Sequence, residues 1–275
     1  MNMLKERCIA LRRQGHTLPE IVRATGRSKT TVYFHIQDLP LAPEKLAVVR
    51  RAAGQRIRQF ALARKGKSAR EFIPVTKWTP QNVLLLGHLL FDGEIMRRVC
   101  AYNNRSEALR NRVEILMQSV YAFAPSRYRN TKTGVGRIAY FNVALSEHLH
   151  DRARMLLGEI VTLQKKLKRE FLRAFFDDEG CMDFMPSKRR RVRGYQKDLT
   201  ILRIVKALLA DFGVEARIVE PNEIAIIGKQ NLERFEIEIN FSPGVCINGK
   251  RTNSRWKKSL EKRELLRMAI ASYKN

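Results

Sequence analysis

The chain is short of negative charge. Its 275 residues include 27 Asp and Glu against 53 Lys and Arg, so the formal net charge at pH 7 is +26. Such an excess of positive charge indicates a polyanionic partner, because neutralising phosphates is a generic source of affinity. Nucleic acid is the first candidate partner, and an anionic membrane surface is the second.

Long apolar runs and paired cysteines are also missing. No run approaches the roughly 18 apolar residues that span a bilayer, and the start, MNMLKERCIALRRQG, lacks the apolar core of a signal peptide. The four cysteines are far apart and form no CxxC pair. We therefore expect a cytoplasmic protein with free thiols, no membrane partner, no zinc site and no disulfide. The hydrophobic fraction of 44% is that of an ordinary globular chain.

Residues 1–39 contain the signals of three short helices. Thr17 is placed to cap the second helix, with Glu20 at the capping-box position. Gly26 then makes a turn, and Ser28 is placed to cap the third helix. The stretch LPEIVRATGRSKTTVYFHI resembles the helix-turn-helix of resolvases and of many bacterial and archaeal regulators.

This resemblance implies that the third helix enters the DNA major groove with its first turns facing base edges. The residues at those positions are Lys29, Thr30, Tyr33 and Phe34. We predict DNA contacts for Lys29, Thr30 and Tyr33. The alternative is a three-helix bundle that contacts proteins. Residues 40–75 are predicted to be a basic, helical linker, which either follows a DNA backbone or is a solvated charged helix.

The rest of the chain is predicted to be α+β and internally duplicated. The first repeat, residues 76–164, and the second repeat, residues 165–245, show the same order of elements, αββαββα. In the first repeat we expect a strand over IMRRVCAYNN, and the run QKKLKR is interpreted as a basic spacer between the repeats. Residues 246–275 form a basic segment followed by a final helix.

Each repeat opens with an apolar helix that ends in an acidic residue and a glycine. The two stretches are LLGHLLFDG and LRAFFDDEG, and their glycines, Gly93 and Gly180, are 87 residues apart. They resemble the nine-residue signature of the LAGLIDADG homing endonucleases. The resemblance covers most of residues 78–242, including the order of elements after each signature.

The resemblance implies a specific arrangement. The two signature helices pack side by side at a pseudo-dyad, and the last acidic residue of each, Asp92 and Glu179, comes to the bottom of that interface. Each repeat lays an antiparallel sheet into the DNA major groove, so that the two sheets form a saddle. The partner would be double-stranded DNA, and one chain would act as a monomer with pseudo-two-fold symmetry.

The acidic helix ends have an independent physical meaning. A carboxylate at a helix C-terminus is unfavourable by about 0.3–1 kcal/mol, since unpaired carbonyls make that end negative. Two such ends together are reasonable if a cation lies between them, and carboxylates with carbonyls suit Mg²⁺. Only Asp92 and Glu179 are acidic in both copies, because Asp177 and Asp178 correspond to Leu90 and Phe91. The alternative is that these acids only cap and solubilise helix ends.

Two features depart from the family pattern. Gly87 and Ala174 keep the small residues of the helix contact, but Phe91 and Asp178 do not. We therefore expect the helices to splay or their contact to be repacked. Lys229 is the best match for a basic catalytic residue at the end of a last strand, and Asn142 stands at the equivalent place in the first repeat.

Two basic strands are candidates for contacting bases. A strand places alternate residues on one face, where arginine favours guanine. The residues predicted to bind DNA in this way are Arg98, Tyr102 and Asn104 in the first repeat, and Arg189, Arg191, Arg193 and Tyr195 in the second. A solvated loop is the alternative for the second set.

The sequence thus predicts a Mg²⁺-dependent, site-specific endonuclease of the homing type. The first alternative is a transcription regulator that joins a helix-turn-helix to the same fold without catalysis, and an RNA maturase is the second. No intein splice junction is present, so we expect a free-standing protein.

Overall fold

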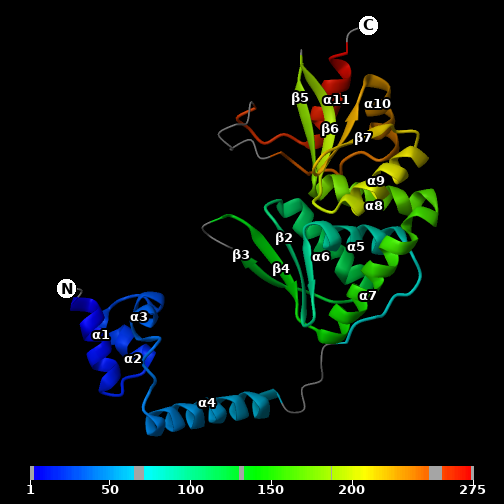
Figure 1. The fold of residues 1–275 in the computed structure, drawn as a ribbon. Coiled ribbons are helices and arrows are strands. Elements are labelled where there is room, and N and C mark those ends of the chain that lie inside the picture. The colour runs from blue at the N-terminus through cyan, green and yellow to red at the C-terminus, as the bar shows by residue number, and fades with distance from the viewer. Residues whose placement is uncertain (1–2, 65–70, 130–132, 187, 248–255, 274–275) are drawn as a thin grey trace. The chain divides into compact units, whose positions relative to one another are not determined.

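A computed structural model describes residues 3–64, 71–129, 133–186, 188–247 and 256–273 (Figure 1). The chain divides into two compact units, Met1–Ser68 and Ala69–Asn275. In the described residues, no helix is long and apolar enough to cross a membrane. The four cysteines are free thiols, as predicted.

The first unit is helical. Its helices are α1 (Met3–Arg13), α2 (Leu18–Thr25), α3 (Lys29–Ile36) and α4 (Pro43–Arg64). The Thr17 amide donates to Glu20 Oε2 at 2.7 Å, and the Thr31 amide donates to Ser28 Oγ at 3.2 Å. These caps start α2 and α3 where the sequence predicts them. The small core consists of Cys8, Ile21, Val32 and Ile36, which come from all three short helices.

The second unit repeats one order of elements twice. The first repeat comprises α5 (Pro80–Phe91), β1 (Gly93–Met96), β2 (Val99–Asn104), α6 (Glu107–Tyr121), β3 (Ser126–Arg129), β4 (Gly136–Tyr140) and α7 (Val143–Glu159), followed by a 3-10 turn, η1 (Ile160–Thr162). The second comprises α8 (Lys165–Asp178), β5 (Gly180–Met185), β6 (Arg189–Tyr195), α9 (Leu199–Asp211), β7 (Ala216–Val219), β8 (Glu223–Ile227) and α10 (Lys229–Glu238). A last helix, α11 (Lys262–Ala271), follows. The predicted αββαββα duplication is confirmed.

Each repeat builds one antiparallel sheet of four strands. The strand orders are β1-β2-β4-β3 and β5-β6-β8-β7, so the two sheets have the same topology. Side chains alternate between the helix-covered face and an open face. On β6, for example, Val192 is fully buried against the core, whereas the neighbouring Arg193 is only partly buried. One-sided burial explains why basic residues alternate with apolar ones in this strand.

Two predictions about elements were wrong. Residues 95–104 form a hairpin, with Arg97 and Arg98 at its turn, instead of one strand. The turn carries none of the Gly, Asn or Pro residues that announce a tight turn. The run QKKLKR is largely the first part of α8 and not a spacer, because Leu167 is buried on one side of the helix while its basic neighbours lie outside.

The central feature of the second unit is the contact between α5 and α8 (Figure 1). A Cβ atom added to Gly87 would lie 2.6 Å from the Ala174 Cβ, so the helix backbones approach closely. The Phe91 ring packs edge-on against Phe171 and Phe175, with centroids 5.4 and 5.2 Å apart. The contact is therefore repacked around a large side chain and is not splayed.

This close approach makes a prediction about stability. Gly87→Ala should destabilise the second unit, because overpacking costs about 1–3 kcal/mol, more than the roughly 0.5–1 kcal/mol that alanine gains over glycine in a helix. Thermal unfolding monitored by circular dichroism measures the change. Ala174→Gly should rescue Gly87→Ala, since it removes the opposing methyl group.

A helical glycine with open space around it provides the control. Gly158 in α7 has no atom within 4 Å of an added Cβ, so Gly158→Ala should leave the unfolding temperature unchanged or raise it. Equal destabilisation by both alanines would show that the helix contact is not tight at Gly87.

Candidate functional site

Asp92 and Glu179 occupy equivalent places at the ends of the two central helices. Each is the C-terminal cap of its helix, α5 or α8, and is followed by the first residue of a strand. A Cβ on Gly93 would lie 2.4 Å from the Leu89 carbonyl oxygen, and one on Gly180 would lie 2.3 Å from that of Phe176. Glycine therefore lets each strand leave its helix at once, which holds both acidic residues at the interface.

Both carboxyl groups hold protons more tightly than usual. Burial, and then the charge of Asp178, raises the pKa of Asp92 from 3.8 to about 7. Burial, followed by the charges of Asp92 and Asp178, raises the pKa of Glu179 from 4.5 to about 7. The two groups thus lie in one partly desolvated, negatively charged environment. A cation is the simplest compensation for such an environment.

The first repeat holds Asp92 in place. Asn104 Nδ2 donates to Asp92 Oδ2 at 2.6 Å and also contacts the Tyr102 hydroxyl at 3.2 Å. The Tyr102 hydroxyl donates to Asp178 Oδ1 at 2.5 Å. Tyr102 and Asn104 therefore belong to the acidic site. The prediction that Tyr102 contacts DNA was wrong, because its side chain is fully buried.

The contact between α5 and α8 places equivalent positions of the two repeats opposite each other, but the residues at these positions differ in chemistry. By the 87-residue offset, Phe91 corresponds to Asp178, and His88 corresponds to Phe175. The Phe91 ring packs on the Phe175 ring. At the counterpart position, an Asp178 carboxylate oxygen lies 2.8 Å from His88 Nδ1. Burial lowers the pKa of His88, but the Asp178 carboxylate outweighs it and the net shift is upward. One contact is thus aromatic, and its counterpart is ionic.

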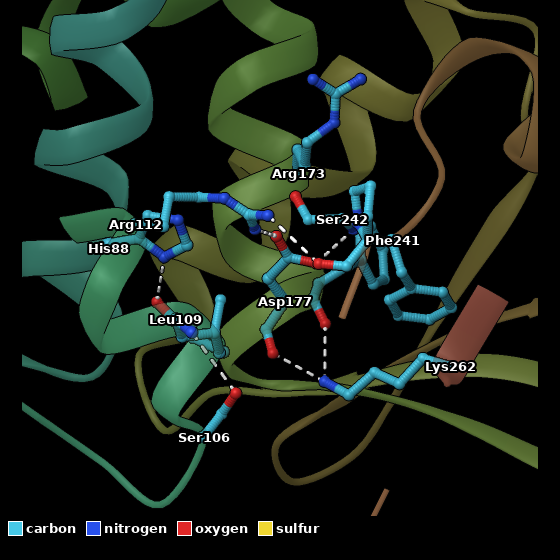
Figure 2. A network of polar contacts seen from close by, with 12 residues as sticks. His88, Ser106, Leu109, Arg112, Arg173, Asp177, Phe241, Ser242 and Lys262 are labelled. Carbon is cyan, nitrogen blue, oxygen red and sulfur yellow. Dashed lines mark hydrogen bonds and ion pairs between the residues drawn. The ribbon is translucent and has the colours of Figure 1, made fainter. Parts of the chain in front are cut away.

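Asp177 is a buried structural anchor in the last turn of α8 (Figure 2). Its Oδ1 accepts from the Ser242 amide at 2.8 Å, and Arg112 Nη1 of α6 lies 3.5 Å from Oδ2. Arg112 also donates to the Pro243 carbonyl at 3.2 Å. The carboxylate therefore ties the first repeat and the segment after α10 to the signature helix of the second repeat.

Lys262 is a buried lysine at the end of α8, and the sequence analysis did not place it there. It opens α11 and is 7% exposed, and its Nζ donates to the Phe176 and Asp177 carbonyls at 3.2 and 2.6 Å (Figure 2). This ammonium offsets the negative end of α8. In the sequence, Lys262 is marked only as the first residue of the final predicted helix. No motif connects that helix to the acidic site. Lys229, which was predicted at a strand end, is the first residue of α10.

The open face of the second sheet carries the predicted basic residues. Arg189, Arg191, Arg193 and Tyr195 share one face of β6, as expected, and alternate with Arg190, Val192 and Gly194 on the other face. In the first repeat the open face instead presents Glu94, Asn103 and Arg137, which are hydrogen-bonded to one another. Arg98 lies exposed at the β1–β2 turn. Tyr102 and Asn104 of β2, which were predicted to share a DNA-facing surface with Arg98, are instead bonded to Asp178 and Asp92.

The residues predicted for the helix-turn-helix lie at one surface of the first unit. Lys29, Thr30, Tyr33 and Phe34 are exposed on α3, with Tyr33 and Phe34 at 54% and 70%. Val32 and Ile36 face the core and fix this orientation. Exposed aromatic side chains beside basic ones are suited to a binding surface.

Comparisons with known proteins agree with this architecture. Residues 166–240 match the LAGLIDADG-like domain family. Full-length DUF199/WhiA from Thermatoga maritima is similar with a TM-score of 0.50 and 16% identity, over 73% of this chain and 63% of that chain. This chain thus spans less than two thirds of that protein. At this identity, the likeness concerns the fold alone.

Structures of the homing endonuclease I-DmoI are also similar. Its mesophilic variants give a TM-score of 0.48 at 15% identity, over 60% of this chain and 95% of theirs. I-DmoI in complex with DNA and Mn gives 0.46 at 16% identity, over 58% of this chain and 96% of that chain. No curated protein sequence matches significantly.

The raised pKa values of Asp92 and Glu179 predict how stability depends on pH. Because both folded-state pKa values lie above the unfolded values, the pair favours folding most when protonated, and this contribution is lost as pH rises toward and through about 7. The variant Asp92→Asn with Glu179→Gln should therefore gain stability over the metal-free wild type between pH 5 and 8. Thermal melts at each pH measure the difference, and exposed Asp151→Asn is the control. If the unfolding temperatures of wild type and variant changed with pH in parallel, the raised pKa values of Asp92 and Glu179 would be contradicted.

Proposed function

We propose that this protein binds a specific double-stranded DNA sequence and cleaves it with a divalent metal ion. The proposal starts from the LAGLIDADG-like domain that the chain carries. One observation carries this proposal: Asp92 and Glu179 end two closely packed helices, in a partly buried environment that raises both pKa values to about 7. A partly desolvated acidic pair of this kind is unfavourable for folding, and such pairs are concentrated at functional sites.

The residues present fit a hard cation such as Mg²⁺. Two carboxylates offer oxygen ligands, and Asn104 orients one of them. Among the described residues, no group of three or more His, Cys, Asp or Glu is arranged to hold a metal. We propose Asp92 and Glu179 as the two protein ligands, and water and phosphate oxygens would supply the others. When bound, such an ion activates water and stabilises the leaving oxygen of a phosphodiester.

The chain's own residues would prepare this chemistry. Lys262 and Asp177 hold the last turn of α8, from which Glu179 projects. The open faces of the two sheets would lie in the major groove and set the register of the duplex. Because one chain supplies both repeats, we propose that a monomer is sufficient. Lys229 remains a proposed basic residue near the site.

A second candidate is a DNA-binding regulator without catalysis. It is favoured by the internal charge compensation: His88 pairs with the buried Asp178, and the Lys262 ammonium caps the same helix end. These groups reduce the need for a metal ion. Both candidates require binding to double-stranded DNA, and they differ in whether the bound duplex is cut.

Isosteric substitutions distinguish the two candidates. In an endonuclease, Asp92→Asn and Glu179→Gln should each reduce Mg²⁺- or Mn²⁺-dependent cleavage by at least about 100-fold, since metal ligation needs both charges. DNA binding, titrated in Ca²⁺, should persist. Cleavage of a duplex selected from a random library is read on a denaturing gel.

Exposed acids provide matched controls for this experiment. Asp151→Asn and Glu215→Gln remove the same charges at exposed positions and should leave cleavage unchanged. Cleavage by the double variant at the wild-type rate would place the active site elsewhere. A tightly bound duplex that the wild type never cuts would favour the regulator.

The helix-turn-helix makes a separate prediction. If α3 contacts DNA, Lys29→Ala should weaken binding and lower the log–log salt slope by about 1, because one phosphate contact is lost. Tyr33→Ala should weaken binding with little change in the slope. Lys5→Ala removes an exposed charge from α1 and is the control. Identical salt titrations for Lys29→Ala and wild type would exclude Lys29 from the interface.

A further inference from the structure

The open face of the second sheet carries acidic residues among its arginines. Asp183 on β5 and Glu223 on β8 flank the central strand β6, whose Arg191 and Arg193 point to the same face. In a surface meant only to attract phosphates, these two carboxylates would be unfavourable. Their position calls for another explanation.

The four side chains form a ladder of alternating charge. Arg191 Nε contacts Asp183 Oδ2 at 3.0 Å, and Arg191 Nη1 contacts Glu223 Oε1 at 3.2 Å. The other oxygen of Glu223 accepts from Arg193 Nη1 at 3.0 Å. Glu223 therefore binds both arginines, one with each oxygen.

Stability does not explain the ladder well. The side chains of Arg191, Asp183 and Glu223 are 24%, 22% and 19% exposed, and that of Arg193 is 43% exposed. Solvent still reaches all four side chains and screens their ion pairs, which reduces what these pairs contribute to folding. Their main effect is to restrict the rotamers of two long side chains before any ligand arrives.

The restriction leaves a defined set of donors facing outward. Within the described part of the chain, the Nε and Nη2 atoms of Arg193 have no protein partner, so one full edge of its guanidinium remains for a bidentate contact. Arg191 uses both Nε and Nη1 on carboxylates, which leaves Nη2. A planar pair of donors matches the O6 and N7 acceptors of guanine in the major groove.

The spacing of the two arginines matches the spacing of bases. Residues i and i+2 of a strand are roughly 6.6 Å apart, and two base-pair steps of B-DNA span about the same distance, at 3.4 Å each. Two arginines on one face of β6 therefore align with base pairs two steps apart. The first sheet has a smaller version of the device, in which Arg137 Nη1 contacts Glu94 at 3.0 Å and Asn103 at 3.2 Å.

We propose that Glu223 is a specificity-determining positioning residue, which holds Arg193 and Arg191 to read two G·C base pairs two steps apart in the half-site under the second sheet. The preference is stronger at the pair that faces Arg193, because its free edge is bidentate. This inference rests on the proposed DNA binding, and it holds whether or not the DNA is cut.

Selection from randomised duplexes by the full-length protein, in Ca²⁺, tests the proposal. The wild type should select G·C at two positions two steps apart, with about tenfold or greater discrimination at the stronger one. Glu223→Gln should reduce that discrimination to about two- to threefold while binding to random DNA becomes tighter, since a negative charge has been removed. Damage to the fold would instead weaken both the base discrimination and the binding to random DNA. Weaker discrimination together with tighter binding to random DNA therefore identifies a positioning role.

A second substitution and a control complete the design. Arg193→Lys keeps the charge but removes the bidentate fork, so it should abolish the preference at the stronger position and keep the other. Arg217→Gln removes an exposed charge from β7 on the same face, and it should weaken binding to all sequences evenly. Unchanged base preferences in Glu223→Gln and Arg193→Lys would overturn the inference. A wild type with no salt-sensitive binding to any duplex would instead overturn the proposed function itself.

Discussion

The approach of α5 and α8 at Gly87 and Ala174 is the constraint on which the second unit depends. Only small side chains at this point let two helix backbones come so close. The contact sets the separation of the two helix ends, and those ends carry Asp92 and Glu179. It also sets the placement of the two sheets, since each first strand leaves its helix directly at a glycine. A single packing distance thus determines both the acidic pair and the surfaces on either side of it.

Bringing two helix C-termini together concentrates negative charge, and the structure shows how part of it is offset. His88 faces Asp178 within the helix contact, and Lys262 and Arg112 approach the last turn of α8 from α11 and α6. Among the acidic residues at these helix ends, Asp92 and Glu179 remain partly accessible to solvent, and their pKa values are raised. The C-terminal segment is therefore an integral part of the second unit, because its first helical residue lies beneath the signature helix.

The sequence predicted the features that depend on local rules. Caps at Thr17, Ser28 and Thr79, and glycines after the acidic residues, act over a few residues and can be read directly. It did not predict which face of β2 would turn inward, since alternation defines two faces without saying which one a helix will cover. Tyr102 was misplaced for that reason. Lys262 was missed because its partners, the carbonyls of residues 176 and 177, are more than 80 residues away in the chain.

The unequal chemistry of the helix contact has a consequence for assembly. If the first repeat paired with a copy of itself, each His88 would face Phe91 and lose its carboxylate. If the second repeat did so, each Asp178 would be buried against Phe175 with no imidazole to neutralise it, and an unpaired buried charge is strongly destabilising. Each half is thus complementary to the other and incompatible with itself. The second unit is therefore directional despite its duplicated fold, and if it binds DNA as we propose, it would distinguish a target sequence from its reverse.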